Sequence, residues 1–166
     1  GIEINNPKLR KIDDKIHITD GIKRVYQLVK GKPRPYVSAE VIADDTIDWL
    51  STQDSPFFCW SHYMDVNHPC FPPEEYRVRA GVGDVSQTQV SDWYSDLLQN
   101  PGTLTEEEIE SLRKLYDASI DYTCDQVDRI LISLKDTGIY EDTLVIITSD
   151  HGELFGEKGG FGHNPH

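Results

Sequence analysis

Residues 144–151, LVIITSDH, place an unbroken run of apolar side chains directly before a carboxylate and an imidazole. The run has the length of a strand. Its continuous apolarity is typical of a strand buried on both faces, as in a parallel sheet between helices. The preceding stretch, residues 105–138, has the pattern of a helix. We therefore predict a helix–strand unit that ends in polar side chains able to bind a ligand.

The predicted helix has signals at both ends. Thr105 and Glu108 form a capping-box pattern at its start, and Gly138 is a natural stop. Between them, apolar residues recur along one face at helical spacing. These residues are Ile109, Leu112, Tyr116, Ile120, Val127, Ile130, Leu131 and Leu134.

A second helix–strand pair precedes the first. Ser38 is a plausible N-cap for a helix, and the aromatic run at residues 57–62, FFCWSH, has the pattern of a buried strand. Residues 63–104 are expected to be mainly loop, with a short helix around residues 89–99. Two strands joined through a helix favour a right-handed parallel crossover. The predicted fold class is α/β with a parallel sheet.

Charge divides the chain unevenly. The net charge is -13, yet residues 1–36 carry nine Lys/Arg against four Asp/Glu. We interpret residues 1–37 as a charged N-terminal arm with short strands, rather than as a contact for an anionic partner. The pattern does not favour nucleic-acid binding, and no apolar run is long enough to cross a bilayer. The acidic body slightly favours a cytoplasmic location. The chain is expected to be a fragment of a longer protein.

Two polar clusters follow the predicted strands. One is HYMDVNHP at residues 62–69, which contains Asp65 and His68, and the other begins at Ser149. Ligands bind outside the carboxyl ends of the strands in open α/β sheets, so both clusters should meet at one edge. Within the first cluster, His62 is expected to be structural. Taken alone, His68 would be interpreted as a surface histidine.

Asp150 and His151 are candidate metal ligands at the end of the second predicted strand. A hard oxygen with an imidazole nitrogen suits Zn²⁺ or Mn²⁺ better than Ca²⁺. The alternative is an Asp that caps the next turn and a His that bonds to backbone. The glycine-rich stretch that follows lacks the phosphate-loop patterns, but Lys158 and His163 within it could contact an anion. A plain flexible loop is the alternative.

No covalent nucleophile is recognisable. The chain lacks a GxSxG elbow, and its three cysteines form neither a metal pair nor a disulfide ladder. Cys59 and Cys124 lie in apolar-patterned segments and are expected to be in the core.

Two long passages resemble the sulfatases of the alkaline phosphatase superfamily. They are PFFCWSHYMDVNHPCFPPEEY at residues 56–76 and DTLVIITSDHGELFGEKG at residues 142–159, the latter preceded by the predicted helix. The resemblance covers about residues 38–163. It implies a three-layer parallel-sheet sandwich of the alkaline phosphatase-like type, with residues 38–166 as a partial catalytic domain.

The resemblance also implies a metal-dependent hydrolase of small sulfate or phosphate esters. Asp150 and His151 match two of the family's ligands for one divalent ion, which by resemblance is Ca²⁺. His68 matches a histidine that contacts the sulfuryl or phosphoryl oxygens. His163 stands where the family has a Lys or His near the leaving group, and Lys158 or His163 could stabilise or protonate the leaving oxygen.

The chain departs from the family pattern in several places. The family's nucleophile is a formylglycine made in a CxPSR-like motif, which no cysteine of the chain matches, and the early aspartate ligands are absent as well. We expect both outside this chain, and the chain inactive alone. Asp128 and Lys158 stand where other residues are common in the family, and His163 in place of Lys leaves the precise ester open. Phosphodiesterases, phosphonate hydrolases and phosphoglycerol transferases of the superfamily remain alternatives, as does a non-catalytic binding module. The oligomeric state is not predicted.

Overall fold

The computed structural model of the chain describes residues 36–54 and 56–163. All but the last two residues of the predicted arm, residues 1–37, lie outside this part, together with the strands expected there. The elements in chain order are α3 (Ala39–Leu50), α4 (Glu74–Arg79), α5 (Gln87–Gln99), η1 (Pro101–Thr103), α6 (Glu106–Asp136), η2 (Tyr140–Asp142), β1 (Leu154–Phe155), η3 (Glu157–Gly159) and β2 (Phe161–Gly162).

The long helix α6 is the central element, and its predicted ends are confirmed. The Glu108 backbone N–H donates to Thr105 Oγ1 at 3.2 Å, and the Thr105 N–H donates to Glu108 Oε2 at 2.8 Å. Past its C-terminus, Gly138 has a φ of +76°, the left-handed conformation that glycine adopts without steric cost. In the described part of the chain, neither α6 nor any other helix combines the length and apolarity needed to cross a bilayer.

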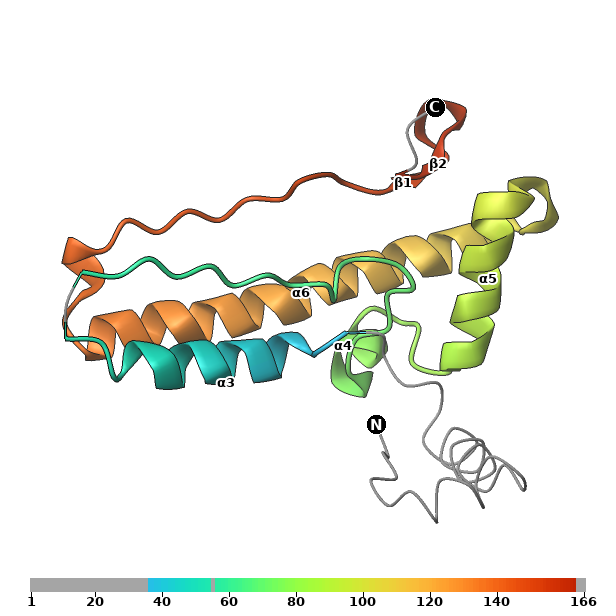
Figure 1. Ribbon diagram of the computed structural model, residues 1–166. Helices are drawn as coiled ribbons and strands as arrows, with labels where there is room; N and C mark the ends of the chain where they lie inside the picture. The colour runs from blue at the N-terminus through green and yellow to red at the C-terminus, as the bar shows by residue number, and fades with distance from the viewer. Residues whose placement is uncertain (1–35, 55, 164–166) are drawn as a thin grey trace, which may run out of the picture. The chain divides into compact units, whose positions relative to one another are not determined.

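The other helices pack on α6 at different points along its length. Helix α3 lies along its C-terminal half, whereas α5 crosses near its N-terminal end (Figure 1). The buried face of α6 only partly follows the predicted apolar positions. Leu112 and Leu134 are buried as predicted, but Ile120 is exposed. Small and polar residues, such as Ala118 and Ser119, are buried instead.

The core has two clusters. The larger joins α5, the first part of α6 and β1, and the smaller joins α3, α4 and the middle of α6. The larger cluster contains Cys70, Val82, Val90, Tyr94, Leu97, Leu112, Leu115 and Phe155. The smaller contains Ala39, Tyr76, Ala118 and Tyr122. Helix α4 was not predicted, and α5 begins two residues before the predicted helix at 89–99.

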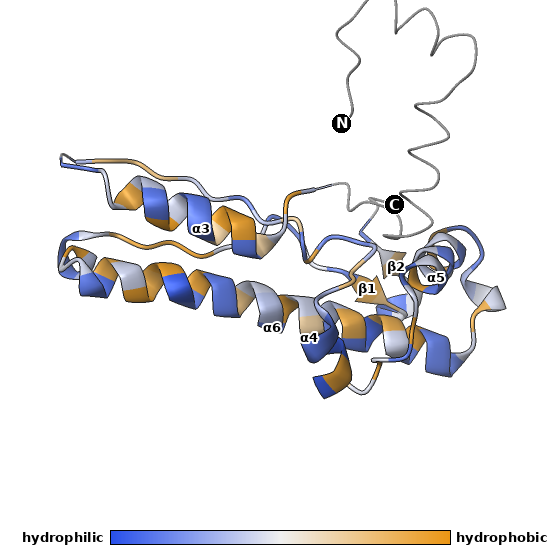
Figure 2. Cartoon of the chain, turned by 90° about the horizontal axis from the view of Figure 1, so that it is seen from below, coloured by the Kyte–Doolittle hydropathy of each residue, from blue (hydrophilic) through white to orange (hydrophobic). Residues whose placement is uncertain are grey.

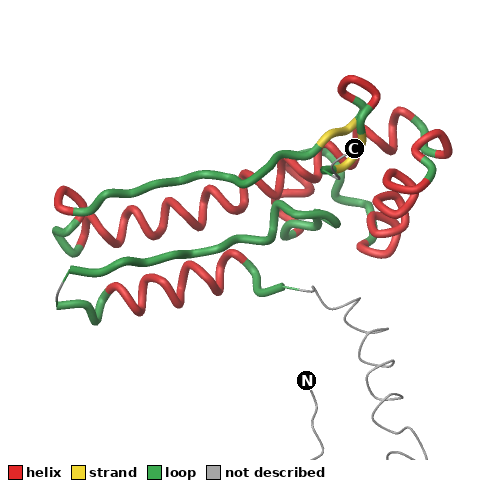
Figure 3. Tube along the Cα trace, turned by 45° about the horizontal axis from the view of Figure 1, so that its top comes forward, coloured by secondary structure: helices red, strands yellow, loops and turns green. Residues whose placement is uncertain are grey.

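The two predicted strands, residues 57–62 and 144–148, run extended along the helices but pair with no strand in the described part (Figure 3). The sheet in that part is a two-stranded antiparallel one, β1 with β2. Phe58 is 85% exposed and Ile146 is 73% exposed, and the apolar run after α6 is orange in Figure 2. An extended segment becomes a strand only when a neighbour takes its backbone hydrogen bonds. The predicted three-layer sandwich is therefore not confirmed.

The cysteine prediction was wrong. Cys59 and Cys124 are exposed, whereas Cys70 is fully buried. Cys59 lies within the exposed aromatic run, which has no second layer to cover it in the described residues. Burial raises the pKa of the Cys70 thiol to about 12, so this sulfur is an apolar core atom and a poor nucleophile.

Candidate functional site

A small hairpin carries one side of the site. Strands β1 and β2 pair Leu154 with Gly162 and Phe155 with Phe161. The hairpin is fixed to α6 because Arg113 donates to the Phe155 carbonyl at 3.2 Å, while the Phe155 ring lies in the larger core cluster. His163 follows β2 directly. Its position is therefore tied to the core through the hairpin.

Gly162 is required where the hairpin meets α5. Its φ is +75°, and a Cβ on it would lie 2.5 Å from Leu98 Cδ2. Only glycine combines this backbone conformation with so close an approach. The contact fixes the path of the chain immediately before His163.

The loop before α4 carries the other side of the site. The His68 ring stacks on Tyr94 of α5, with centroids 5.5 Å apart and planes at 21°. Tyr94 is only 2% exposed, so the histidine rests on a rigid part of the core. Asp65, three residues earlier, is also buried, and the His68–Pro69 peptide bond is cis.

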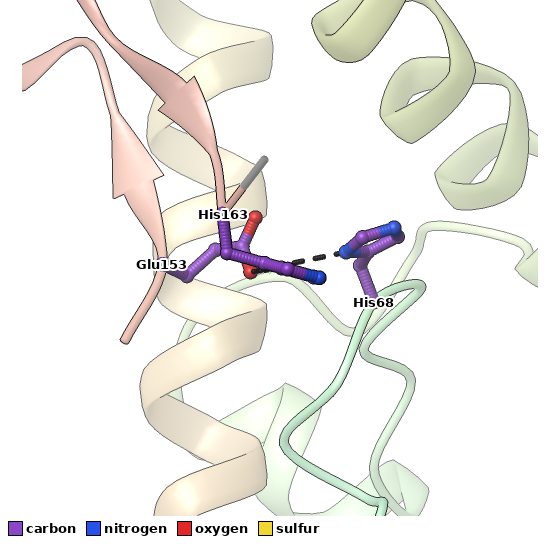
Figure 4. A group of neighbouring side chains, drawn as sticks. All are labelled: His68, Glu153 and His163. Atoms are coloured by element: carbon purple, nitrogen blue, oxygen red, sulfur yellow. Dashed lines mark hydrogen bonds and ion pairs between the residues drawn. The ribbon is translucent and has the colours of Figure 1, made fainter. Parts of the chain in front are cut away.

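His68, Glu153 and His163 come together, although they lie far apart in the sequence (Figure 4). His163 Nδ1 lies 2.8 Å from Glu153 Oε2, a hydrogen bond from the ring N–H to the carboxylate. His68 Nδ1 lies 3.8 Å from the same oxygen, which is a charge contact and too long for a hydrogen bond. The two rings have centroids 4.9 Å apart. Both histidines thus face one carboxylate.

The Glu153 carboxylate is ionised despite its burial. Its side chain is 2% exposed, and this desolvation by itself raises the carboxyl pKa. His68 and His163 outweigh that effect by contact and charge, so the net pKa is lowered. The cluster therefore pairs a buried negative charge with two partly buried imidazoles.

Asp150 and His151 adjoin this cluster. The His151 ring stacks on His163, with centroids 4.2 Å apart. His151 Nδ1 lies 2.9 Å from the Gly152 carbonyl oxygen, which fixes the ring proton on Nδ1 and leaves Nε2 as the ligand nitrogen. The Asp150 side chain is 83% exposed, with its Oδ1 3.7 Å from His151 Nε2.

These two atoms fit a divalent ion. Metal–ligand bonds of about 2.0–2.5 Å place neighbouring ligand atoms roughly 3–3.5 Å apart, close to the observed separation. His68, Glu153 and His163 form a second donor set, with ligand atoms within 4.8 Å of one another. The bond between Glu153 and His163 occupies two of those ligand atoms, while Asp150 Oδ1 accepts from the His151 backbone N–H at 3.0 Å and leaves Oδ2 and His151 Nε2 without a hydrogen bond in the described part of the chain.

Lys158 and His62 lie apart from the cluster. Lys158 is exposed in η3, at a φ of 56°, and makes no contact with the histidines in the described residues. His62 is exposed rather than structural, and it lines a surface hollow of about 300 Å³ beside α3. A second hollow of about 450 Å³ lies between α5 and the start of α6. Neither hollow contains His68, Glu153 or His163.

The comparison with known proteins decides the family. The Sulfatase family model matches residues 4–166. The chain belongs to the sulfatase family. The resemblance found in the sequence is thereby confirmed, and the match begins well before residue 38. Family membership implies an alkaline phosphatase-like α/β fold and a hydrolase that generally binds a divalent metal.

Three relatives illustrate the match. An arylsulfatase of Clostridium perfringens (strain 13 / Type A) is 24% identical over 131 residues, which are 72% of this chain and 27% of that protein. Arylsulfatase K of Bos taurus is 38% identical over 71 residues, 42% of this chain and 13% of that protein. The multifunctional alkaline phosphatase superfamily protein PehA of Trinickia caryophylli is 42% identical over 65 residues, 37% of this chain and 13% of that protein. No solved structure matches the chain. This sulfatase-family chain thus spans about a quarter of the Clostridium relative.

Glu153 is the residue of this candidate site that the sequence did not indicate. Its signal is weak because a glutamate in a polar glycine-rich stretch is ordinarily exposed. One usable signal was its spacing. Residues two apart on an extended chain point the same way, so Glu153 shares a face with His151.

Proposed function

We propose that this chain supplies part of the metal and anion site of a sulfate ester hydrolase. The observation that carries the proposal is the meeting of His68 and His163 at one buried carboxylate, with the His151 ring stacked on His163. The two segments involved are separated by more than eighty residues of sequence. Such an assembly of imidazoles offers several N–H donors to an anionic group that must be held and desolvated.

Each side chain has a role in this proposal. Asp150 and His151 hold one divalent ion, with Ca²⁺ indicated by the family and Zn²⁺ or Mn²⁺ by the ligand types. When bound, the metal neutralises charge that develops on the transferring group. His68 contacts the sulfuryl oxygens, and His163 contacts the ester near its leaving oxygen and can deliver a proton there. Lys158 adds a positive charge from the neighbouring turn.

The nucleophile is proposed to lie outside this chain. The buried Cys70 is a neutral thiol, and the exposed Cys59 and Cys124 are not part of the cluster. The chain alone is therefore expected to be inactive. Hydrolysis of any ester by the isolated chain would contradict this part of the proposal.

Turnover by the full-length protein tests the function. Wild-type protein should hydrolyse 4-nitrophenyl sulfate, and His68→Ala or His163→Ala should each lower kcat/KM at least tenfold. Lys158→Ala should have a smaller effect because its side chain does not reach the histidines. Full activity of both histidine variants would overturn the assigned roles.

Metal analysis tests the ligand pair separately. Full-length wild-type protein should contain a divalent ion that is lost from Asp150→Ala and from His151→Ala. Asp142→Ala is the matched control, because it removes an exposed carboxylate from η2 before the same extended segment. Metal content unchanged in all three variants would refute the assignment.

A phosphoryl-transfer enzyme of the same superfamily is the second candidate, and a non-catalytic module is the third. The similarity to PehA, a multifunctional protein of the alkaline phosphatase superfamily by name, is the reason to keep the second candidate. A CxPSR or SxPSR motif in the full-length sequence would favour the sulfatase, whereas an unmodified Thr or Ser nucleophile would favour phosphoryl transfer. Loss of the family's early aspartates from that sequence would favour the non-catalytic module.

A further inference from the structure

We propose that Glu153 is a positioning residue, which holds His68 and His163 with their Nε2 atoms free for the ester. The inference rests on the anion-contact roles proposed above for these two histidines. Glu153 itself touches neither the ester nor the metal in this account. It acts through the two rings.

The contacts of Glu153 are confined to the histidines. Within the described residues, its recorded interactions are the 2.8 Å hydrogen bond from His163 and the 3.8 Å charge contact with His68. Its other oxygen, Oε1, is buried without a hydrogen-bond partner there. A buried carboxylate is costly unless it is paired. The histidines thus provide the compensation for burying this charge.

Glu157, on the same hairpin, is a carboxylate with a structural role and serves as a comparison for Glu153. It accepts from the Phe155 backbone N–H at 2.6 Å and from Arg113 Nη2 at 3.3 Å. These contacts close the turn and fix it to α6. The hairpin is therefore held by Glu157, and Glu153 is not needed for that purpose.

Both contacts of Glu153 are to Nδ1. Because the carboxylate occupies that side of each ring, Nε2 is the nitrogen left for a substrate. The remaining ring contacts restrict rotation further, since His68 stacks on Tyr94 and His163 stacks on His151. The His163 imidazole is thus held by a hydrogen bond at Nδ1 and by stacking along its face, whereas His68 is held by stacking and by the longer contact of its Nδ1 with the carboxylate. A donor held in this way needs less reorganisation when the ester binds.

A double-mutant cycle in the full-length protein tests the proposal. Glu153→Gln keeps the size of the side chain and removes its charge. It should lower kcat/KM for 4-nitrophenyl sulfate about 10–100-fold, the usual loss when the partner of a functional histidine is removed. In a His163→Ala background, the same change should have a smaller effect because one of the two rings to be positioned, the one hydrogen-bonded to Glu153, is gone.

Glu157→Gln is the matched control, from the same hairpin. Its effect should be the same with and without His163. Glu153→Asp keeps the charge and should retain more activity than Glu153→Gln. It replaces the glutamine variant in the test if that variant does not fold. Metal content should stay at the wild-type level in Glu153→Gln, because the ligand pair is intact.

Three results would overturn the proposal: full activity of Glu153→Gln, an effect that adds fully to that of His163→Ala, or loss of the metal from Glu153→Gln. Calorimetric binding of inorganic sulfate separates these from failure of the proposed function, since it requires no turnover. If wild-type protein hydrolyses no sulfate ester, the double-mutant cycle uses the affinity for inorganic sulfate in place of kcat/KM. Non-additive loss of that affinity would support positioning even where the hydrolase assignment fails.

Discussion

Replacing Gly162 by alanine should destabilise the hairpin that carries His163. Two other glycines separate the loss of stability into a backbone part and a steric part. Gly162 has a φ of +75° and lies against Leu98 of α5. Gly159 has the same φ of +75°, but a Cβ there would meet nothing within 4 Å. Gly152 has neither a positive φ nor a neighbour within that distance.

The magnitudes follow from these differences. A side chain in the left-handed region costs about 1–2 kcal/mol, which is the whole effect expected for Gly159→Ala. In Gly162→Ala the new methyl lies 2.5 Å from Leu98 Cδ2, so that side chain must move by about 1 Å to reach ordinary contact. Because the displaced atom is the end of a half-buried leucine side chain, overpacking adds about 1 kcal/mol, for a total of roughly 2–3 kcal/mol. Gly152→Ala should stay within about 0.5 kcal/mol of wild type.

Urea unfolding of the three variants and wild type measures these differences. The expected order of destabilisation is Gly162→Ala, then Gly159→Ala, then Gly152→Ala. Equal stability of the first two variants would show that the hairpin does not press on α5 and would refute the account of how His163 is placed. In the full-length protein, Gly162→Ala should also lower turnover more than Gly159→Ala does.

Three further predictions concern the core, the helix cap and the exposed strands. In alkylation at pH 8 followed by mass spectrometry, the exposed Cys59 should be modified rapidly and Cys70 should stay unmodified. Burial raises the pKa of Cys70 to about 12 and keeps it a protonated thiol. Equal labelling of the two cysteines would contradict the burial of Cys70. Thr105→Ala removes a cap hydrogen bond and should destabilise the chain by about 1 kcal/mol in urea unfolding. Ser38→Ala should destabilise it by less, because the Ser38 side chain makes no cap hydrogen bond. A larger loss for Ser38→Ala than for Thr105→Ala would refute this difference between the two caps. Ile146 is exposed here, so Ile146→Thr should change the stability of this chain by less than about 0.5 kcal/mol. If the rest of the domain buries residues 144–148, the same change should destabilise the full-length protein by roughly 1–3 kcal/mol. The same effect in both proteins would show that Ile146 is not buried in the full-length protein.

Local signals in the sequence located the helices. The capping box at Thr105 and the stop at Gly138 involve residues that interact within a few positions of each other, so the pattern alone suffices. The face of α6 was less well predicted. Which residues of α6 are buried depends on where α3, α4 and α5 contact it. At these contacts Ala118 and Ser119 are buried, while Ile120 is exposed.

The strands could be recognised as extended segments but not placed in a sheet. Residues 57–62 and 144–148 have the composition of buried strands, and they are extended as expected. Pairing depends on a partner backbone, which the described residues do not provide. Phe58 and Ile146 are exposed for the same reason.

The sequence indicated two of the residues that come together, and their functional roles stay predictions. His68 and His163 were singled out from two distant segments, and they do meet. Their partner Glu153 could not be deduced from local sequence, because its burial arises only when the hairpin packs beside the His68 loop. The same packing leaves Lys158 exposed at the tip of the turn.

The most direct test of the proposed function is the ratio of kcat/KM for 4-nitrophenyl sulfate to that for 4-nitrophenyl phosphate, measured on the metal-loaded full-length protein. The two esters share a leaving group, so the ratio reports only how the site treats the transferring group. A sulfate ester hydrolase should give a ratio well above one, and His68→Ala should reduce the sulfate rate. A ratio well below one would contradict the proposed function and assign the site to phosphoryl transfer.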